Sequence, residues 1–334
     1  MPELPEVETV RRDLEGALVG ASVARVEVSG LRSTRRHAEP AGFVAAVTGR
    51  TLRSFGRRGK YLVIGLGATS PSSSTAAGER TGSAAGTGRG TAAGTGRGTA
   101  AGTGGTAAAA GPAADAGAPG CTGPAGAPSD VLVVHLRMSG QLRLAASAGE
   151  PRPPHAHVVL SFADGRELRF VDPRTFGELF VTSAGMPELA GLGVDALDPA
   201  LTPELLARTL AGRRARMKPL LLDQRVIAGI GNIYSDEILW AARLRWSRRA
   251  ATLRPVDVRR LHGALRSVLA EAVEHRGSSL SDAQYVDVAG RPGAYQQRHA
   301  VYGRTGQPCL VCGRPIERAT VAQRSHHWCR TCQR

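Results

Sequence analysis

The chain has 334 residues, of which 43 are Lys or Arg and 28 are Asp or Glu, so its formal net charge is +15. That length allows two or three domains with a sizeable core, and the excess positive charge favours a polyanionic partner, most often nucleic acid. No run of 18 apolar residues and no basic leader before an apolar stretch occurs. The sequence therefore predicts a cytoplasmic protein rather than a membrane or exported one.

The chain begins MPELPEVETV, and this first segment has the features of a helix. Pro5 suits a first helical turn, acidic side chains suit the positive end of a helix, and apolar residues recur at helical spacing from Leu4 to Leu18. These rules account for Pro5 and Glu6. They give no reason for a proline at position 2.

Short strands fill the rest of the first 185 or so residues, in the pattern of a β-sandwich. They are predicted at residues 22–28, 51–58, 60–66, 131–138, 157–162, 167–172 and 178–182. Residues 163–167 (ADGRE) form a turn between two of them.

Residues 67–129 interrupt this pattern with Gly, Ala, Thr, Ser and Pro, and the unit AAGTGRGT occurs twice, at 84–91 and 92–99. Such a segment buries too little apolar surface to offset its ordering entropy, so we expect it to be disordered. The strands on either side would otherwise form a hairpin, and closing this longer loop costs only about 2 kcal/mol more than closing a five-residue one. The insert carries three Arg, one Glu and one Asp, which leaves a net charge of +14 on the rest of the chain.

From about residue 200 to 276 the apolar spacing is helical. The predicted helices cover 202–212, 217–224, 232–244 and 256–276. In the turn before the third helix, Gly229 and Gly231 allow close backbone approach, and free N–H groups at the helix start would face an anion such as a DNA phosphate. An ordinary connection between helices has the same pattern, although Lys218 and the basic run 212–216 favour the phosphate.

The last segment contains Cys309, Cys312, Cys329 and Cys332 with the spacing C-x2-C-x16-C-x2-C. Two such pairs on a β-hairpin fit one tetrahedral zinc ion, and four cysteine ligands leave no open position, so we expect a structural metal. Residues 288–334 carry eight Arg and one Glu, which favours contact with phosphates.

Two loops carry side chains that could enter a base stack. FVDPRTFGELF (170–180) presents Arg174 and Phe176, and VHLRMSGQL (134–142) presents Met138. An arginine and apolar side chains can fill a gap between bases. A core Phe beside a surface Arg, or a packed edge Met, would give the same sequence.

Eight motifs stand in a fixed order along the chain: MPELPEVETVRR, RRGKYL, HLRMSGQL, HAHV, DPRTFG, GIGNIYSDE, VYGRTGQPC and the four-cysteine segment. In this order they resemble the bacterial formamidopyrimidine-DNA glycosylases, which remove 8-oxoguanine and ring-opened purines from DNA. The resemblance covers the chain except residues 67–129. Leu4 favours this branch over the related endonuclease VIII branch, which usually has Gly there. The segment 277–293 resembles the family loop that closes over the flipped base.

The resemblance implies chemistry at the N-terminus. Removal of Met1 would leave Pro2 with a free secondary amine, of which on the order of a tenth is unprotonated at neutral pH if its pKa is near ~8. In the family this amine attacks C1′ of the damaged nucleotide and forms an iminium, an electron sink for eliminating the 3′ and then the 5′ phosphate. Glu3 would protonate the sugar ring oxygen, and Glu6 would support the site.

Other family roles fall on further residues. Lys60 is implied in binding and β-elimination, and Arg324 in the δ step. Met138, Arg174 and Phe176 would fill the hole left by the flipped nucleotide. Contacts with the DNA backbone are implied for His155, Arg213, Lys218 and Asn232. The chain departs from the family pattern at Thr175, where some members have a second arginine, and at His326, where threonine is frequent.

We therefore predict an α+β protein with three domains: a β-sandwich with a leading helix (1–198), a helix–two-turn–helix domain (199–287) and a zinc-finger hairpin (288–334). It should bind one structural Zn²⁺ and act as a monomer on double-stranded DNA that contains oxidised bases or abasic sites, at the nucleoid. One alternative is an endonuclease VIII-like enzyme for oxidised pyrimidines. Another is a non-catalytic module that holds damaged DNA and needs neither Pro2 nor Glu3.

Overall fold

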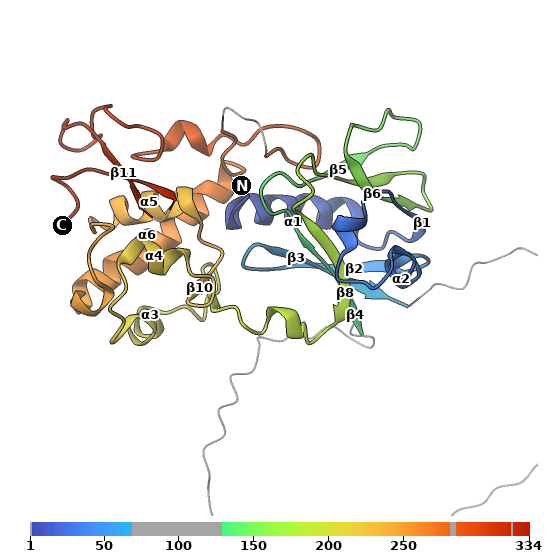
Figure 1. Cartoon of the computed structure of the whole chain (residues 1–334), viewed down its shortest axis with the longest axis horizontal. Coiled ribbons are helices and arrows are strands. Elements are labelled where there is room, and N and C mark those ends of the chain that lie inside the picture. Colours follow the sequence, from blue (N-terminus) through green and yellow to red (C-terminus); the bar gives the residue numbers. More distant parts are fainter. Residues whose placement is uncertain (1, 69–128, 281–284, 322) are drawn as a thin grey trace, which may run out of the picture. The chain divides into compact units, whose positions relative to one another are not determined.

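The computed structural model describes residues 2–68, 129–280, 285–321 and 323–334 (Figure 1). Residues 67–129, which we expect to be disordered, lie almost wholly outside the described residues. Part of the segment 277–293, which resembles the family loop that closes over the flipped base, also lies outside them. Among the described residues, no helix is both long and apolar enough to cross a membrane.

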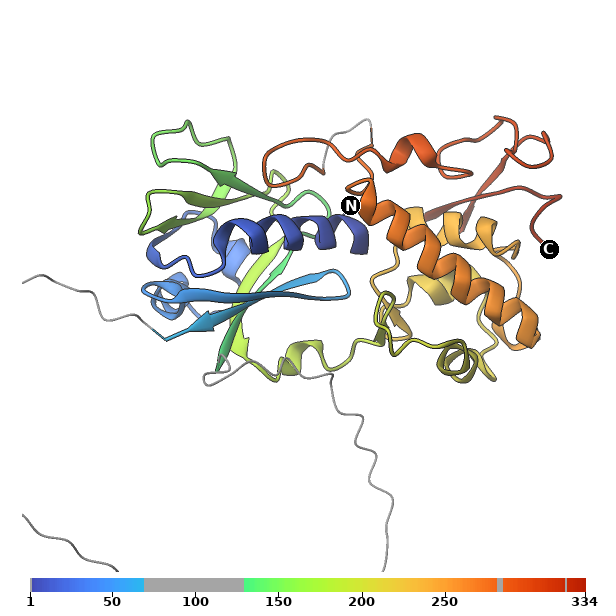
Figure 2. The same cartoon turned by 180° about the vertical axis from the view of Figure 1, so that it is seen from behind.

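The predicted first helix is α1 (Leu4–Leu18). It begins with a capping box between Glu3 and Glu6 and has Pro5 in its first turn. Its apolar stripe joins the core of the sandwich, whereas Leu4, at its very start, packs into the core of the helical part. The first turn of α1 therefore lies where the two cores meet, near α6 (Figure 2).

The predicted sandwich is present as two four-stranded antiparallel sheets, although the strand at Gln141–Ala145 was not predicted. One has the order β2 (Thr51–Arg58), β3 (Tyr61–Gly67), β4 (Asp130–His135) and β8 (Glu178–Ser183). The other has the order β1 (Val23–Val28), β6 (Ala156–Phe162), β7 (Glu167–Val171) and β5 (Gln141–Ala145). The pairing of β3 with β4 runs from Tyr61 and His135 to Leu66 and Asp130, which confirms the hairpin predicted across the insert.

Two helical elements between β1 and β2 were not predicted, because the sequence indicated no helix in that part of the chain. They are η1 (Leu31–Thr34) and α2 (Pro40–Val47). Only two residues of α2, Phe43 and Val47, are buried. A single apolar pair four residues apart is too short a pattern to indicate a helix.

The four predicted helices of the second part are present as α3 (Pro203–Leu210), α4 (Met217–Leu222), α5 (Asn232–Ala241) and α6 (Pro255–Glu274). The strand β9 (Val194–Asp195) pairs in parallel with β10 (Ile227–Ala228), and short 3₁₀ turns are η2 (Pro187–Leu189), η3 (Ala250–Thr252) and η4 (Tyr295–Arg298).

The chain ends in an antiparallel hairpin, β11 (Glu317–Val321) and β12 (Arg324–Trp328), and β12 packs against α5. His326, which departs from the family pattern, is buried there with its ring centroid 4.6 Å from that of Trp246. The domain boundaries after residues 198 and 287 remain predictions.

Candidate active site

The carboxylate of Glu3 is held at the N-terminus of α5. It accepts hydrogen bonds from the backbone N–H groups of Ile233 (2.9 Å) and Tyr234 (3.5 Å), and Glu3 is only 1% exposed. Gly231 makes this approach possible, because a Cβ atom at that position would lie 2.2 Å from the carboxylate carbon. Gly229 has a φ of 108° and leaves room for Leu4 in the same way.

The close approach predicted at these glycines is confirmed, and the group that approaches in the structure differs from the one that the sequence favoured. The sequence favoured a DNA phosphate at the start of α5. The structure places a carboxylate of the protein there, and its oxygens already engage the N–H groups of the first turn. The turn therefore orients Glu3.

Glu6 fixes the backbone of Glu3. Pro2 and Glu6 are both buried. The Glu6 carboxylate accepts hydrogen bonds from the Glu3 backbone N–H (2.8 Å), the Tyr234 hydroxyl (2.5 Å) and the Ser278 backbone N–H (2.7 Å). Burial, together with the nearby charge of Glu3, raises the pKa of Glu6. The supporting role of Glu6 was predicted, whereas no pattern in the sequence indicated Tyr234 or Ser278.

Lys60 lies in the turn between β2 and β3 and is 7% exposed. Burial lowers the pKa of its amine, the carboxylates of Glu3 and Glu6 oppose that shift, and the positive charge of Arg324 adds to it. The charges of three other predicted site residues therefore act on the Lys60 amine.

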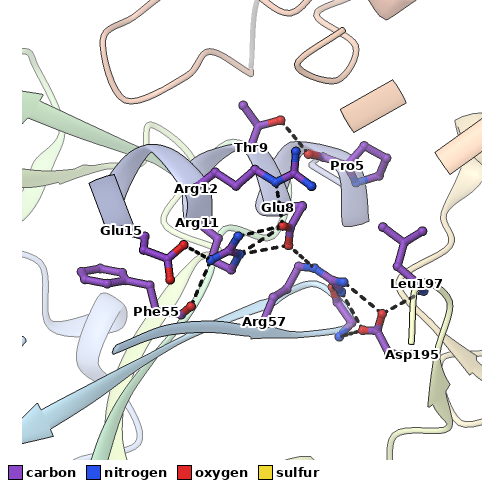
Figure 3. Close-up of polar contacts among 11 residues, drawn as sticks. Pro5, Glu8, Thr9, Arg11, Arg12, Glu15, Phe55, Arg57, Asp195 and Leu197 are labelled. Carbon is purple, nitrogen blue, oxygen red and sulfur yellow. Dashed lines mark hydrogen bonds and ion pairs between the residues drawn. The ribbon is translucent and has the colours of Figure 1, made fainter. Parts of the chain in front are cut away.

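Arg57 fixes the turn that carries Lys60 (Figure 3). Its guanidinium donates to Glu8 of α1 (3.1 Å) and, through two nitrogens, to Asp195 of β9 (2.6 and 3.0 Å). Asp195 also accepts the backbone N–H of Gly59 (2.6 Å). This bidentate pair ties the lysine turn to α1 and to β9. Arg57 and Asp195 were not predicted, because nothing in the sequence indicates that they meet.

A cavity of about 430 Å³ opens beside Glu3. Its lining residues are Glu3, Met138, Asn232, Ile233, Leu280, Tyr302, Gln323 and Arg324. Four of these were predicted site residues, and they come from the N-cap of α1, the loop after β4, the start of α5 and the zinc-finger hairpin. The amide nitrogen of Asn232 donates to the hydroxyl of Ser325 (3.2 Å), next to Arg324 in the chain.

Lys218 does not lie where the sequence suggested. Its side chain is fully buried, its Nζ lies 2.8 Å from the Asp236 carboxylate, and it donates to the backbone carbonyl of Ser325 (2.6 Å). Asp236 in turn accepts the backbone N–H of His327 (2.9 Å). An ammonium enclosed in this way cannot reach a phosphate in this structure. The geometry does not support the predicted DNA contact of Lys218, which instead joins α4 and α5 to β12.

The remaining predicted DNA-binding residues are at the surface: Met138, His155, Arg174, Phe176 and Arg213. Met138 is 38% exposed and Phe176 is 40% exposed, although both are large apolar side chains. The guanidinium carbon of Arg174 lies 5.0 Å from the centroid of the Phe176 ring, which pairs these two side chains.

The four cysteines form one cluster. Their sulfur atoms all lie within 4.8 Å of one another, with 3.5 Å between Cys312 and Cys329 and 3.9 Å between Cys309 and Cys332. A tetrahedron with Zn–S bonds of about 2.3 Å has sulfur–sulfur edges of about 3.8 Å. The four thiols therefore fit one structural zinc ion, as predicted.

Family comparisons agree with this architecture. The formamidopyrimidine-DNA glycosylase N-terminal domain matches residues 1–82 and 120–179, and the H2TH domain of the same enzymes matches 192–284. The zinc finger found in FPG and IleRS matches 306–334.

Relatives match along the whole chain. The formamidopyrimidine-DNA glycosylase of Symbiobacterium thermophilum is 38% identical over 337 residues, which cover 100% of this chain and 89% of the relative. The crystal structure of the MutM (Fpg) protein from Thermus thermophilus is 37% identical, with a TM-score of 0.72 and coverage of 99% and 98%. A complex of Lactococcus lactis Fpg with abasic-site DNA is 28% identical, with a TM-score of 0.75 and full coverage of both chains. The chain belongs to the formamidopyrimidine-DNA glycosylase family, as its motifs predicted.

Proposed function

We propose that this protein is a bifunctional DNA glycosylase and abasic-site lyase that excises oxidised purines from duplex DNA and uses Pro2 as its nucleophile. One observation carries the proposal: the Glu3 carboxylate, adjacent to Pro2, is anchored on the amides of α5 and faces a cavity that Arg324 and Met138 also line. The nucleophile directly precedes the proton donor in the chain, and the proton donor and a cation both line this cavity. A module that only bound DNA would have no use for the first two.

The first step uses the two residues that follow Met1. Once Met1 is removed, the lone pair of the Pro2 amine attacks C1′ of the damaged nucleotide, and the bond from C1′ to the base breaks. The base leaves with the bonding electron pair and takes a proton from water. The Glu3 carboxylate takes up the N–H proton of Pro2, which is now bonded to C1′, and gives it to the ring oxygen of the sugar, which opens the ring and leaves a cationic iminium on Pro2. The α5 amides hold the Glu3 carboxylate in position for that transfer.

The later steps need a base and a cation. Because burial lowers the pKa of Lys60, a larger share of its amine is neutral and able to take the C2′ proton. The electron pair of the broken C2′–H bond moves toward the iminium and forms an enamine, whose electrons then expel the 3′ phosphate. Arg324, at the start of β12, then assists loss of the 5′ phosphate. Zinc, when bound to the four cysteines, gives this small hairpin its fold and thereby holds Arg324 in place.

DNA recognition falls to the exposed residues. Met138, Arg174 and Phe176 enter the space that the flipped nucleotide leaves, while His155, Arg213 and Asn232 contact the backbone. With a net charge of +14 outside the insert, the protein stays close to DNA in the cytoplasm as a monomer.

Cleavage of matched duplexes tests the proposal. The purified protein is incubated with duplexes that carry one 8-oxoguanine, one thymine glycol or no lesion, and the ends of the products are identified. We expect excision of 8-oxoguanine followed by loss of both phosphates. Faster cleavage at thymine glycol would favour the endonuclease VIII-like alternative, and tight binding without cleavage would favour the binding module.

A further inference from the structure

The two loops that carry the exposed apolar side chains lie side by side at one end of the sandwich. Residues 136–140 lead from β4 to β5, and residues 172–177 lead from β7 to β8. Because β4 pairs with β8 and β5 pairs with β7, each loop crosses between the two sheets at the same end. Each also holds one non-glycine residue in the left-handed region, Arg137 and Thr175, both with a φ of 53°. Such a conformation persists only where the surroundings enforce it.

One buried carboxylate connects the two loops. Asp172 is fully buried, and its Oδ1 accepts a hydrogen bond from the Ser139 hydroxyl at 2.6 Å, across from the other loop. Its Oδ2 accepts the backbone N–H of Gly177 (2.7 Å), and Oδ1 also accepts that of Arg174 (3.3 Å). The Asp172 side chain therefore fixes Ser139, which follows Met138. It also fixes Arg174 and Gly177, which stand on either side of the pair Thr175–Phe176.

A second carboxylate connects both loops to a third segment. Glu178 is 2% exposed and accepts from Arg137 (2.7 Å) in the first loop and from Arg36 (3.1 Å). Arg35 lies 3.0 Å from the same carboxylate and donates to the backbone carbonyls of Phe176 and Gly177, both at 3.0 Å. Burial alone would raise the pKa of Glu178, but the surrounding arginines lower it to about 2. The carboxylate is thus ionised at every pH at which the protein would act.

We propose that Asp172 and Glu178 are positioning residues that hold Met138 and Phe176 as one preformed unit before DNA arrives. The inference rests on the proposed role of these two side chains in filling the gap at the lesion. Fixing a flexible loop on binding costs backbone entropy for every residue that becomes ordered. With both loops already fixed to the same carboxylates, the two apolar side chains insert together and lose little freedom in the complex.

The hydroxyl of Ser139 offers the mildest test, because Ser139→Ala removes the link that Asp172 makes between the loops and deletes only one buried hydroxyl. The readout is lesion preference, defined as the affinity for a duplex with a tetrahydrofuran abasic analogue divided by the affinity for the undamaged duplex. We expect Ser139→Ala and Asp172→Asn each to lower this ratio about tenfold, the size of a lost hydrogen bond to a charged group. Affinity for undamaged DNA should not change, since that binding is electrostatic.

Two comparisons separate positioning from simple loss of stability. Glu167→Gln removes another buried carboxylate, which pairs with Arg169 in β7, and should leave the ratio unchanged. Because Ser139 acts through Asp172, the double variant Ser139→Ala/Asp172→Asn should lose no more than Asp172→Asn alone. Stopped-flow fluorescence of 2-aminopurine opposite the lesion should show a slower insertion phase after an unchanged association phase.

The outcomes also separate this inference from the proposed function. If Phe176→Ala and Met138→Ala leave lesion preference unchanged, the gap-filling role fails. If those two variants lower it while Ser139→Ala and Asp172→Asn do not, or if the Ser139 and Asp172 effects add, the positioning role is wrong.

Discussion

Replacing Lys218 with methionine should destabilise the protein rather than weaken a phosphate contact. In the structure the ammonium is fully enclosed and lies 2.8 Å from the Asp236 carboxylate, which is itself 1% exposed. Methionine fills a similar volume but leaves that carboxylate buried without its counter-charge. Breaking a buried ion pair from one side costs roughly 3–5 kcal/mol. The free energy of unfolding should fall by that amount.

The same change should also disturb the zinc-finger hairpin, because Lys218 holds the Ser325 carbonyl and Asp236 holds the His327 backbone. Arg324 precedes these residues directly. The variant should therefore release less of the product that has lost both phosphates, relative to the product that has lost only one. Urea unfolding followed by tryptophan fluorescence gives the stability, and gel analysis of the products gives the ratio.

A matched variant and a double variant sharpen the experiment. Arg169→Met breaks another buried pair, with Glu167 in β7, and should lower stability without changing the product ratio. In Lys218→Met/Asp236→Asn the unpaired charge is gone, so part of the lost stability should return. If Lys218 instead contacts DNA, Lys218→Met should leave stability unchanged and reduce the slope of log affinity against log salt by about 1. That pair of results would refute the structural role.

Three further predictions concern other parts of the chain. Cys329→Ser should abolish zinc binding and DNA binding while the sandwich stays folded, and metal analysis that finds no zinc in active protein would contradict this. Deletion of 67–129 with a short turn in its place should keep excision within a few fold, because Leu66 already pairs with Asp130; a folded but inactive variant would show that the insert is needed. Burial raises the pKa of Glu237 to about 7, although the backbone N–H groups of residues 300–302 oppose the shift. Its contribution to stability is therefore full below about pH 4.5 and is lost as the pH rises through 7, a decline of roughly 3 kcal/mol. Chemical denaturation should show this decline between pH 4.5 and 7 in the wild type but not in Glu237→Gln, and parallel curves for the two proteins would contradict it.

Elements with a long or repeated apolar pattern could be predicted from the sequence. The stripe from Leu4 to Leu18 indicated α1, and the strand-like segments on both sides of the insert indicated the β3–β4 hairpin, which the pairing of Leu66 with Asp130 confirms. The helix α2 has only two buried residues and left no such signal.

Within the site, motifs indicated which residues matter but not what they contact. The glycines before α5 did indicate a close approach, yet only the folded chain shows that Glu3, more than 220 residues earlier in sequence, occupies that position. Lys218 stands near basic residues in the sequence, whereas its actual partner, Asp236, is reached only through the packing of α4 on α5. Contacts of this kind depend on tertiary structure, and local spacing carries no information about them.

The central claim is that the Pro2 nitrogen is the nucleophile, and trapping with borohydride tests it most directly. Native protein mixed with an 8-oxoguanine duplex and borohydride should give a covalent protein–DNA species, because the iminium is reduced to a stable amine. The peptide that carries the sugar remnant should begin at Pro2. A few residues fused ahead of Pro2 convert its amine to an amide, so the fusion should bind the duplex nearly as well but neither excise the base nor be trapped. If the native protein binds without being trapped, or if the fusion is as active as the native chain, the catalytic assignment is contradicted.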